Sequence, residues 1–152
     1  MTTIAWDGER LAADRLAAID GTAFYTQKVY KLRGHLVSFT GVHAAGVALM
    51  HWFANGADPS QFPADAKTDA FWARLVVIPP SGPVRTYEGL GYPCEFDRAR
   101  YAAGTGAQFA LAAMYLGKTA GEAVEVACAL SHTSRGGWTS RTFEDPDDVL
   151  NP

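Results

Sequence analysis

The chain has 152 residues, of which 48% are hydrophobic and only 19% are charged, so it can bury the core of a single domain. This composition excludes a disordered chain, and no apolar run approaches the roughly 20 residues that span a bilayer. Thirteen Lys and Arg against sixteen Asp and Glu give a net charge of −3 without a basic block, so nucleic acid is not expected as a partner.

Hydrophobic periodicity and turn-forming residues predict the secondary structure in chain order. Short strands joined by tight turns are expected first, at 3–6, 11–14, 23–32 and 36–40. Next come a helix at 42–53, a loop at 55–69 and strands at 71–78, 84–88 and 100–103. The chain then has helices at 107–116 and 119–130, a strand at 138–143 and a loose acidic tail at 144–152. This order predicts an α+β fold, with sheets between helical layers, formed by residues 1–152 as one domain.

Three further features concern helix capping, the cysteines and the cellular location. Thr119 and Glu122, three residues apart, form a capping box at the start of the last predicted helix. Cys94 and Cys128 match neither a disulfide framework nor a zinc motif. The N-terminus lacks the basic start and apolar stretch of a signal peptide, so we expect a cytoplasmic protein.

Thr2 would gain a free α-amine, and with it a possible catalytic role, after the loss of Met1. A small second residue such as Thr favours removal of the initiator Met, which would leave Thr2 with a free α-amine near its own hydroxyl. An α-amine has a pKa of about 7.7–8.0, against about 10.4 for lysine, and therefore accepts a proton near neutral pH. A threonine with its own N-terminal amine is a known pairing of nucleophile and base. Thr2 is thus a candidate nucleophile, although any chain can begin Met-Thr without such a role.

Six short segments, in register along almost the whole chain, resemble proteasome β-subunits and their bacterial homologue HslV. They are TTIAWDG at 2–8 with LAADR at 11–15, KVYKL at 28–32, FTG at 39–41, AGTG at 103–106 before the helix 108–116, GKTAGEAV at 117–124, and GG at 136–137. The resemblance implies an N-terminal nucleophile (Ntn) hydrolase. Its fold would be a four-layer αββα sandwich of two antiparallel sheets, with one helical layer reduced because the chain is short.

The resemblance also implies a role for individual residues. Thr2 matches the nucleophile whose hydroxyl attacks the peptide carbonyl, and Asp14 and Lys28 match the buried pair beside it. An ammonium near the hydroxyl lowers the cost of forming an alkoxide, and a carboxylate keeps that ammonium charged and oriented. Gly41 matches the glycine whose backbone N–H binds the oxyanion. Thr105 stands where the family has the serine of a Gly-Ser-Gly segment.

Some of these residues have other interpretations. Asp14 could form a surface ion pair with the adjacent Arg15, and Gly41 could merely start a helix. Lys28 and Lys31 lie three residues apart, which on a strand places them on opposite faces, so only one can point at Thr2. The family motif favours Lys28.

The loop before Gly136 and Gly137 departs from the family. Aligned on this glycine pair, His132 stands where proteasome β-subunits have an aspartate, and Arg135 stands where they have a serine. These two groups help to position the threonine amine in the family. Their replacement puts activity in doubt, as does any Met1 that stays attached, because the Thr2 nitrogen is then an amide.

The leading interpretation is a threonine-type endopeptidase that hydrolyses peptide bonds of unfolded polypeptides. It would work as a homo-oligomeric ring fed by a separate unfoldase ATPase, without cofactor, metal or membrane. The alternatives are an inactive assembly or binding subunit of the same fold and an Ntn amidase for small molecules. The remaining aromatic and imidazole side chains indicate no site: His43 and His51 lie too far apart for one metal, and Trp6, Trp52, Trp72 and Trp138 are expected in the core or at interfaces.

Overall fold

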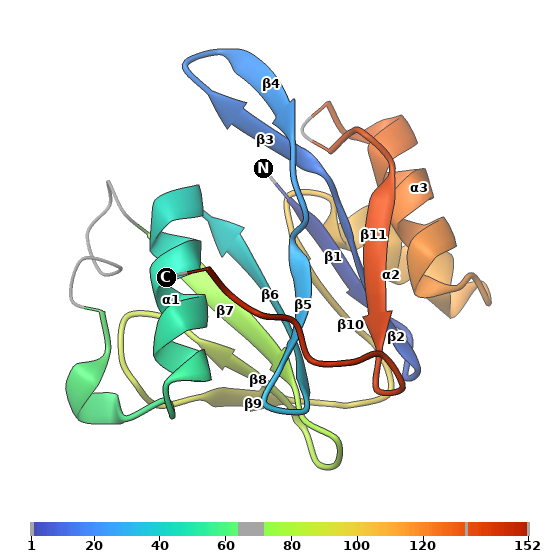
Figure 1. The fold of residues 1–152 in the computed structure, drawn as a ribbon. Helices are drawn as coiled ribbons and strands as arrows, with labels where there is room; N and C mark the ends of the chain where they lie inside the picture. The colour runs from blue at the N-terminus through green and yellow to red at the C-terminus, as the bar shows by residue number, and fades with distance from the viewer. Residues whose placement is uncertain (1, 64–71, 133, 152) are drawn as a thin grey trace.

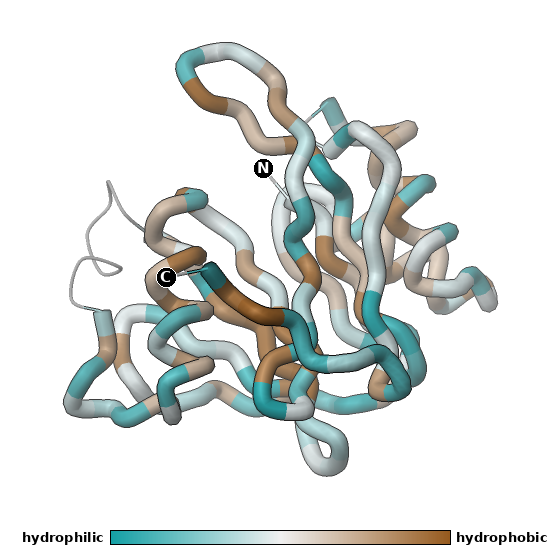
Figure 2. The backbone as a smooth tube through the Cα atoms, in the orientation of Figure 1, coloured by the Kyte–Doolittle hydropathy of each residue, from teal (hydrophilic) through white to brown (hydrophobic). Residues whose placement is uncertain are grey.

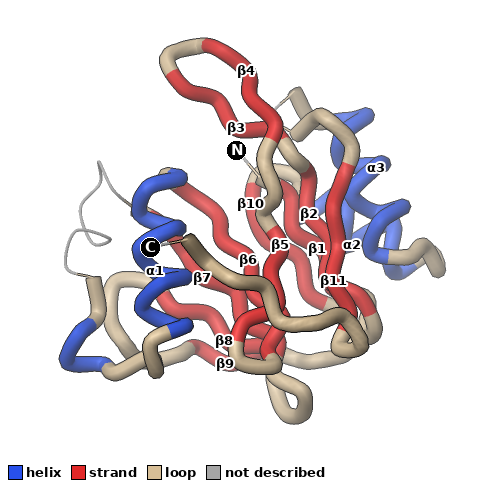
Figure 3. The backbone as a smooth tube through the Cα atoms, in the orientation of Figure 1, coloured by secondary structure: helices blue, strands red, loops and turns tan. Residues whose placement is uncertain are grey.

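Two antiparallel sheets lie face to face in the structure, a computed structural model that describes residues 2–63, 72–132 and 134–151 (Figures 1 and 3). The first sheet has the strand order β10–β1–β2–β11 and the second has β5–β6–β7–β8–β9, while β3 and β4 form a separate hairpin. The strands are β1 (Thr3–Trp6), β2 (Arg10–Asp14), β3 (Leu16–Ile19), β4 (Thr22–Tyr25), β5 (Val29–Leu32), β6 (His35–Gly41), β7 (Ala73–Ile78), β8 (Val84–Tyr87), β9 (Cys94–Phe96), β10 (Tyr101–Gly104) and β11 (Trp138–Thr142). The helices are α1 (His43–Ala54), α2 (Ala107–Tyr115) and α3 (Ala120–Leu130), with a short 3₁₀ helix η1 (Pro59–Gln61).

Side chains alternate between the two faces of each sheet, and in the central strands β1, β2, β6 and β7 both faces are largely buried. In β1, Ile4 and Trp6 pack between the sheets, whereas Ala5 packs against α2 and α3. In β7, Val76 lies between the sheets and Leu75 packs under α1. The layers are therefore α2 and α3, the first sheet, the second sheet and α1. This arrangement confirms the predicted α+β sandwich.

The helical layer on the second sheet is thin, as predicted from the short chain. Within the described residues, α1 is the one α-helix that covers this face (Figure 1). It packs closely because Gly46 lies against the ring of Phe39, where a Cβ would come within 1.9 Å of a ring carbon. None of the described helices is long and apolar enough to cross a membrane.

The predicted capping box is confirmed at the start of α3. The Thr119 side chain accepts a hydrogen bond from the backbone N–H of Glu122, and the Glu122 carboxylate accepts one from the backbone N–H of Thr119. Both bonds satisfy N–H groups that a helix start leaves without partners.

The prediction of a single strand at 23–32 is wrong. The chain instead forms the β3–β4 hairpin, turns at Asp20 and Gly21, and begins β5 at Val29. Asp20 and Gly21 have φ values of +50° and +77°, as a tight two-residue hairpin turn requires. The Asp20-Gly21 pair is the local sequence signal for this turn. The edge strand β9 was not predicted either, and the start of the predicted strand at residue 71 lies outside the described residues.

The acidic tail at 144–152 is not loose, contrary to the prediction. The Asp148 carboxylate accepts hydrogen bonds from the backbone N–H of Lys31 at 2.8 Å and from the Arg141 guanidinium at 2.9 and 3.0 Å. Figure 2 shows a hydrophobic stretch just before the C-terminus, where Leu150 packs against the core beneath α1. The Asp148 carboxylate therefore holds the tail against β5 and β11.

Candidate active site

Two glycines at and after the end of β10 pack closely against Thr2 and Thr3. Thr2 is 5% exposed and directly precedes β1. Gly104 has a φ of +91°, and a Cβ there would lie 1.8 Å from the Thr2 carbonyl oxygen. A Cβ on Gly106 would lie 2.0 Å from the Thr3 hydroxyl. Only glycine allows such close approach, so this segment sets the position of Thr2.

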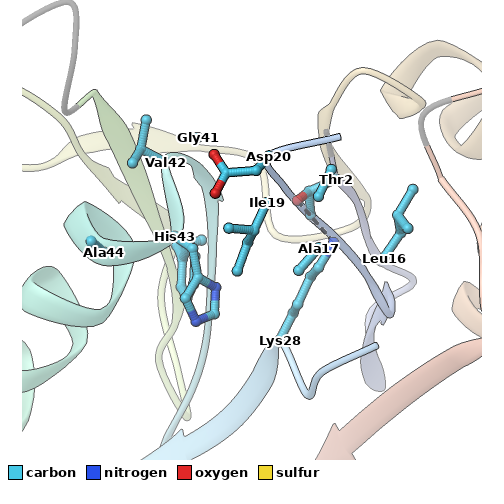
Figure 4. A pocket seen from close by; sticks show the side chains of 12 residues that line it. Thr2, Leu16, Ala17, Ile19, Asp20, Lys28, Gly41, Val42, His43 and Ala44 are labelled. Atoms are coloured by element: carbon cyan, nitrogen blue, oxygen red, sulfur yellow. Dashed lines mark hydrogen bonds between the residues drawn. The ribbon is translucent and has the colours of Figure 1, made fainter. Parts of the chain in front are cut away.

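Lys28 lies beside the Thr2 hydroxyl. Its Nζ atom donates a hydrogen bond to Thr2 Oγ1 at 3.1 Å, and Figure 4 shows the two side chains pointing toward each other. The same Nζ lies 3.2 Å from each oxygen of the Asp14 carboxylate. The Lys28 side chain is 4% exposed and that of Asp14 is fully buried. The structure thus brings together three of the predicted site residues.

Asp14 is held by backbone groups as well as by Lys28. Its Oδ1 accepts a hydrogen bond from the N–H of Thr3 at 2.8 Å, and its Oδ2 accepts one from the N–H of Leu16 at 3.0 Å. A buried carboxylate needs such partners, because an unpaired ion in the interior is very costly. The alternative of a surface ion pair with Arg15 does not fit a carboxylate that is completely buried.

The environment of Lys28 combines burial with one opposite charge. Burial strips water from the ammonium and lowers the pKa of Lys28 below its ordinary 10.5, although the charge and hydrogen bonds of Asp14 oppose this shift. The hydroxyl of Ser38 donates to the Lys28 carbonyl at 2.6 Å and fixes the backbone just before β5. An oriented ammonium so close to a hydroxyl stabilises the alkoxide that forms when the hydroxyl loses its proton.

Lys31 points away from Thr2, as the strand periodicity predicts. Its Nζ donates to the backbone carbonyls of Phe143 and Asp145, at 2.7 and 2.6 Å, in the segment that leads from β11 into the tail. Lys28, and not Lys31, is therefore the residue that faces Thr2.

Gly41 and Thr105 line the space around Thr2. Gly41 ends β6 with a φ of +104°, and a Cβ there would lie 2.4 Å from the Trp72 carbonyl oxygen, so no other residue fits without strain. Thr105 lines a cavity of about 300 Å³ together with Thr2 and Gly41. All five predicted site residues thus lie in the Thr2–Lys28–Asp14 cluster or on the walls next to it.

Two cavities meet at Thr2 and Gly41. The larger, of about 500 Å³, lies between the β3–β4 hairpin and the start of α1 (Figure 4). Besides Thr2 and Gly41 it is lined by Leu16, Ala17, Ala18, Ile19, Asp20, Lys28, Phe39, Val42, His43 and Ala44. The smaller cavity is the one that contains Thr105, and its other walls are Thr40, Gly104, Trp72 and Arg74.

Sequence reasoning missed Ser134. This serine is completely buried, and its hydroxyl lies 2.6 Å from that of Thr3, next to the candidate nucleophile. His132 and Arg135, which the alignment placed at the positioning sites, are exposed instead. The alignment on the Gly136–Gly137 pair requires this loop to have the same length as in the family. A shift of one residue would have brought Ser134 to the place of Arg135.

His43 is a second residue whose position was not foreseen. It lies at the start of α1 and lines the larger cavity. Burial, with a smaller contribution from the charge of Lys28, lowers its pKa below the ordinary 6.5, which favours the neutral imidazole at pH 7. Within the described ranges, no group of three His, Cys, Asp or Glu side chains is placed to hold a metal ion.

No family model and no curated protein sequence matches the chain. Solved structures do match over almost its full length. Eukaryotic HslV from Trypanosoma brucei is 20% identical with a TM-score of 0.69, over 93% of this chain and 98% of that one. The chain has an HslV-like fold.

BPH from Thiobacillus denitrificans gives a similar match. It is 18% identical with a TM-score of 0.65, over 92% of this chain and 95% of that one. Its complex with epoxomicin is 19% identical with the same TM-score, over 92% and 96% of the two chains. At such low identity the likeness concerns the fold alone, which agrees with the Ntn-hydrolase sandwich that the sequence resemblance implies.

Proposed function

We propose that the chain is a threonine-type endopeptidase in which Thr2, after removal of Met1, is the N-terminal nucleophile. One observation carries the proposal: the Lys28 ammonium lies 3.1 Å from the Thr2 hydroxyl and 3.2 Å from both oxygens of a fully buried Asp14. A buried lysine that bonds both a carboxylate and a hydroxyl is far more specific than a surface ion pair. The HslV-like fold supports the same function.

The acylation step uses the Thr2 hydroxyl and its own amine. The free α-amine accepts the hydroxyl proton while Thr2 Oγ1 attacks the carbonyl carbon of the peptide bond. Lys28 stabilises the developing alkoxide, and the backbone N–H of Gly41 donates to the carbonyl oxygen as it becomes negative. The tetrahedral intermediate collapses with cleavage of the C–N bond. The leaving amine takes up the proton that the Thr2 amine holds.

Deacylation returns the site to its starting state. A water molecule gives a proton to the Thr2 amine and attacks the ester carbonyl, after which the ester C–O bond breaks and Thr2 Oγ1 regains a proton. Asp14 does not touch the substrate in this scheme. It acts as a positioning residue because it keeps Lys28 charged and aimed at Thr2.

The cavities favour a polypeptide over a small amide as the substrate. Because two cavities meet at Thr2, there is space for a substrate on both sides of the bond to be cut. A small-molecule amidase needs space mainly for the acyl part. Ser134, buried next to Thr3, supplies a hydroxyl in the region where the alignment found only His132 and Arg135, and this weighs against an inactive subunit.

The surface supports assembly into a homo-oligomer. Large apolar side chains are exposed on the β3–β4 hairpin and on α2 and α3, among them Ile19, Phe24, Tyr115, Leu116 and Leu130. Such patches are typical of interaction surfaces. We propose a ring that encloses the active sites and receives unfolded chains from a separate ATPase. Native mass spectrometry gives the number of subunits, and a monomer would contradict the ring.

The test compares protein that begins at Thr2 with variants of it. Thr2 is exposed by proteolytic removal of an upstream tag, and hydrolysis of an unfolded model protein is followed together with labelling by epoxomicin. We expect hydrolysis and a mass increase for the wild type, loss of both in Thr2→Ala, and no change in Ser81→Ala, which removes an exposed hydroxyl in the turn between β7 and β8 and lines neither cavity. Equal rates for wild type and Thr2→Ala would reject the proposal.

A further inference from the structure

The smaller cavity beside Thr2 has an aromatic wall that the proposed mechanism does not use. Trp72 is 41% exposed and lines this cavity together with Arg74 and Thr105. Its carbonyl accepts a hydrogen bond from the N–H of Val42 at 2.8 Å. A Cβ on Gly41 would lie 2.9 Å from the edge of the Trp72 ring. The indole is thus placed directly next to the backbone that would bind the oxyanion.

The side chain of Arg74 lies against the indole. The Arg74 guanidinium lies over the Trp72 ring, 5.6 Å from its centroid, and Arg74 Nε donates to the Glu88 carboxylate at 2.9 Å. Because Glu88 balances the charge of Arg74, this wall of the cavity attracts neither acidic nor basic side chains strongly. What it offers a ligand is mainly the surface of an aromatic ring.

The order of the reaction decides which cavity takes which part of the substrate. The acyl part stays bonded to Thr2 while the amine leaves and water enters, so it needs the more extensive site. The larger cavity has that role: it is bounded by β3, which among the described strands pairs with β4 alone and leaves its other edge open to an extended chain. The smaller cavity then lies on the side of the leaving amine.

We infer that Trp72 forms the binding site for the residue that directly follows the cleaved bond, and that this site prefers an aromatic side chain. The inference rests on the proposed function and specifies its substrate. An aromatic ring packed on an indole gains about 0.5–1.5 kcal/mol beyond its buried area. This corresponds to a roughly 2- to 10-fold preference for Phe over Ala at that position.

The experiment measures kcat/KM for peptides that differ in one residue only. One series has Phe or Ala after the cleaved bond, and the other varies the residue before it. In Trp72→Ala we expect the Phe/Ala ratio of the first series to fall roughly 2- to 10-fold, whereas the ratios of the second series stay constant. Trp72→Phe should keep most of the preference. If Trp72→Ala lowered kcat/KM by the same factor for every peptide in both series, the inference would be overturned. Trp72 would then only hold the backbone at Gly41 in place.

A matched control comes from a second arginine–aromatic pair. Arg100 lies over the ring of Tyr115, 5.0 Å from its centroid, on an exposed side chain that lines neither cavity. Tyr115→Ala removes the same kind of contact and, in protein that native mass spectrometry shows to have the wild-type number of subunits, should leave the Phe/Ala ratio unchanged. A similar change in this variant would mean that the ratio does not report on the cavity.

A binding measurement separates failure of this inference from failure of the proposed function. In the Thr2→Ala variant, L-phenylalaninamide and glycinamide are titrated while the indole N–H resonance of Trp72 is followed by NMR. We expect phenylalaninamide to shift this resonance at lower concentration than glycinamide. Equal responses would overturn the inference whether or not the wild type cleaves peptides. A differential response without any cleavage would keep the binding site and reject the peptidase.

Discussion

Lys28 and Lys31 are the same residue type, three positions apart, and yet they serve different parts of the molecule. Lys28 points into the space beside Thr2, is 4% exposed and bonds a buried carboxylate. Lys31 points to the other side, where it donates to two backbone carbonyls near the C-terminal tail. The pleat of the chain separates them, because side chains three apart on a strand face opposite ways.

The comparison shows how burial changes what one ammonium does. Lys31 is a half-buried donor that links β5 to the C-terminal segment. Its partners are backbone carbonyls, which every residue has, so its role does not depend on a particular side chain. Lys28 is almost completely desolvated, so its contacts with Asp14 and Thr2 are stronger and its pKa is lowered.

The largest difference is expected in activity. Lys28→Ala removes the cation next to the Thr2 hydroxyl and should lower kcat by roughly 10²–10⁴-fold. Lys31→Ala, the matched control, should leave kcat and KM unchanged at a temperature where both variants are folded. Steady-state peptide hydrolysis checks both values. A comparable loss of kcat in both variants would show that the contrast is one of stability, not of chemistry.

The next largest effect concerns the stability of the buried pair. Asp14→Ala leaves the Lys28 ammonium without its carboxylate and removes the acceptor of two backbone N–H groups, so we expect a loss of about 3–5 kcal/mol in the free energy of unfolding. Adding Lys28→Met to this variant should recover part of the loss, because the unpaired charge is then gone. Urea unfolding measures both. If the double variant were no more stable than Asp14→Ala alone, the unpaired Lys28 charge would not be what destabilises Asp14→Ala.

The pH dependence of activity should show the lowered pKa of Lys28. The rate rises as the Thr2 amine loses its proton, near the ordinary α-amine pKa of about 7.7–8.0, and falls again when Lys28 deprotonates, below pH 10.5. Stability should behave differently. Between the lowered pKa and 10.5 the unfolded chain binds more protons at Lys28, so this residue makes stability rise with pH. Parallel pH–rate and unfolding curves test this, and an alkaline loss of rate that follows unfolding would contradict it.

The smallest effect is expected in the tail. Partial burial raises the pKa of Asp148, but hydrogen bonds from Arg141 and the Lys31 backbone lower it more, so the net value lies below the ordinary 3.8. The stability that Asp148 adds is therefore complete above pH 3.8 and is lost as the pH falls through the lowered value. Asp148→Asn should cost about 1 kcal/mol at pH 7 and nothing at the lowest pH where the protein stays folded. Thermal unfolding at several pH values measures the difference, and a cost independent of pH would show that the charge is irrelevant.

The order of strands and helices followed from local patterns, because those patterns depend on near neighbours. Alternating apolar residues, glycine turns and the Thr119–Glu122 capping box were sufficient for most elements. The Asp20–Gly21 hairpin has a local signal too, because an Asp-Gly pair favours the positive φ values of its two-residue turn. The spacing of Lys28 and Lys31 already required them to face opposite ways.

Tertiary structure alone decided which distant groups meet. That Asp14 is buried instead of exposed beside Arg15 depends on β11 and α3, which follow it by more than a hundred residues. The docking of the tail depends on hydrogen-bond donors on β5 that lie within reach of its carboxylates. A run of acidic residues does not show whether such donors are near it in the folded chain. Ser134 and Trp72 reach the neighbourhood of Thr2 through loops, whose lengths and paths no periodic pattern encodes. The chain by itself therefore determined the elements and the candidate nucleophile, whereas the packing of the two sheets determined the surroundings in which that nucleophile lies.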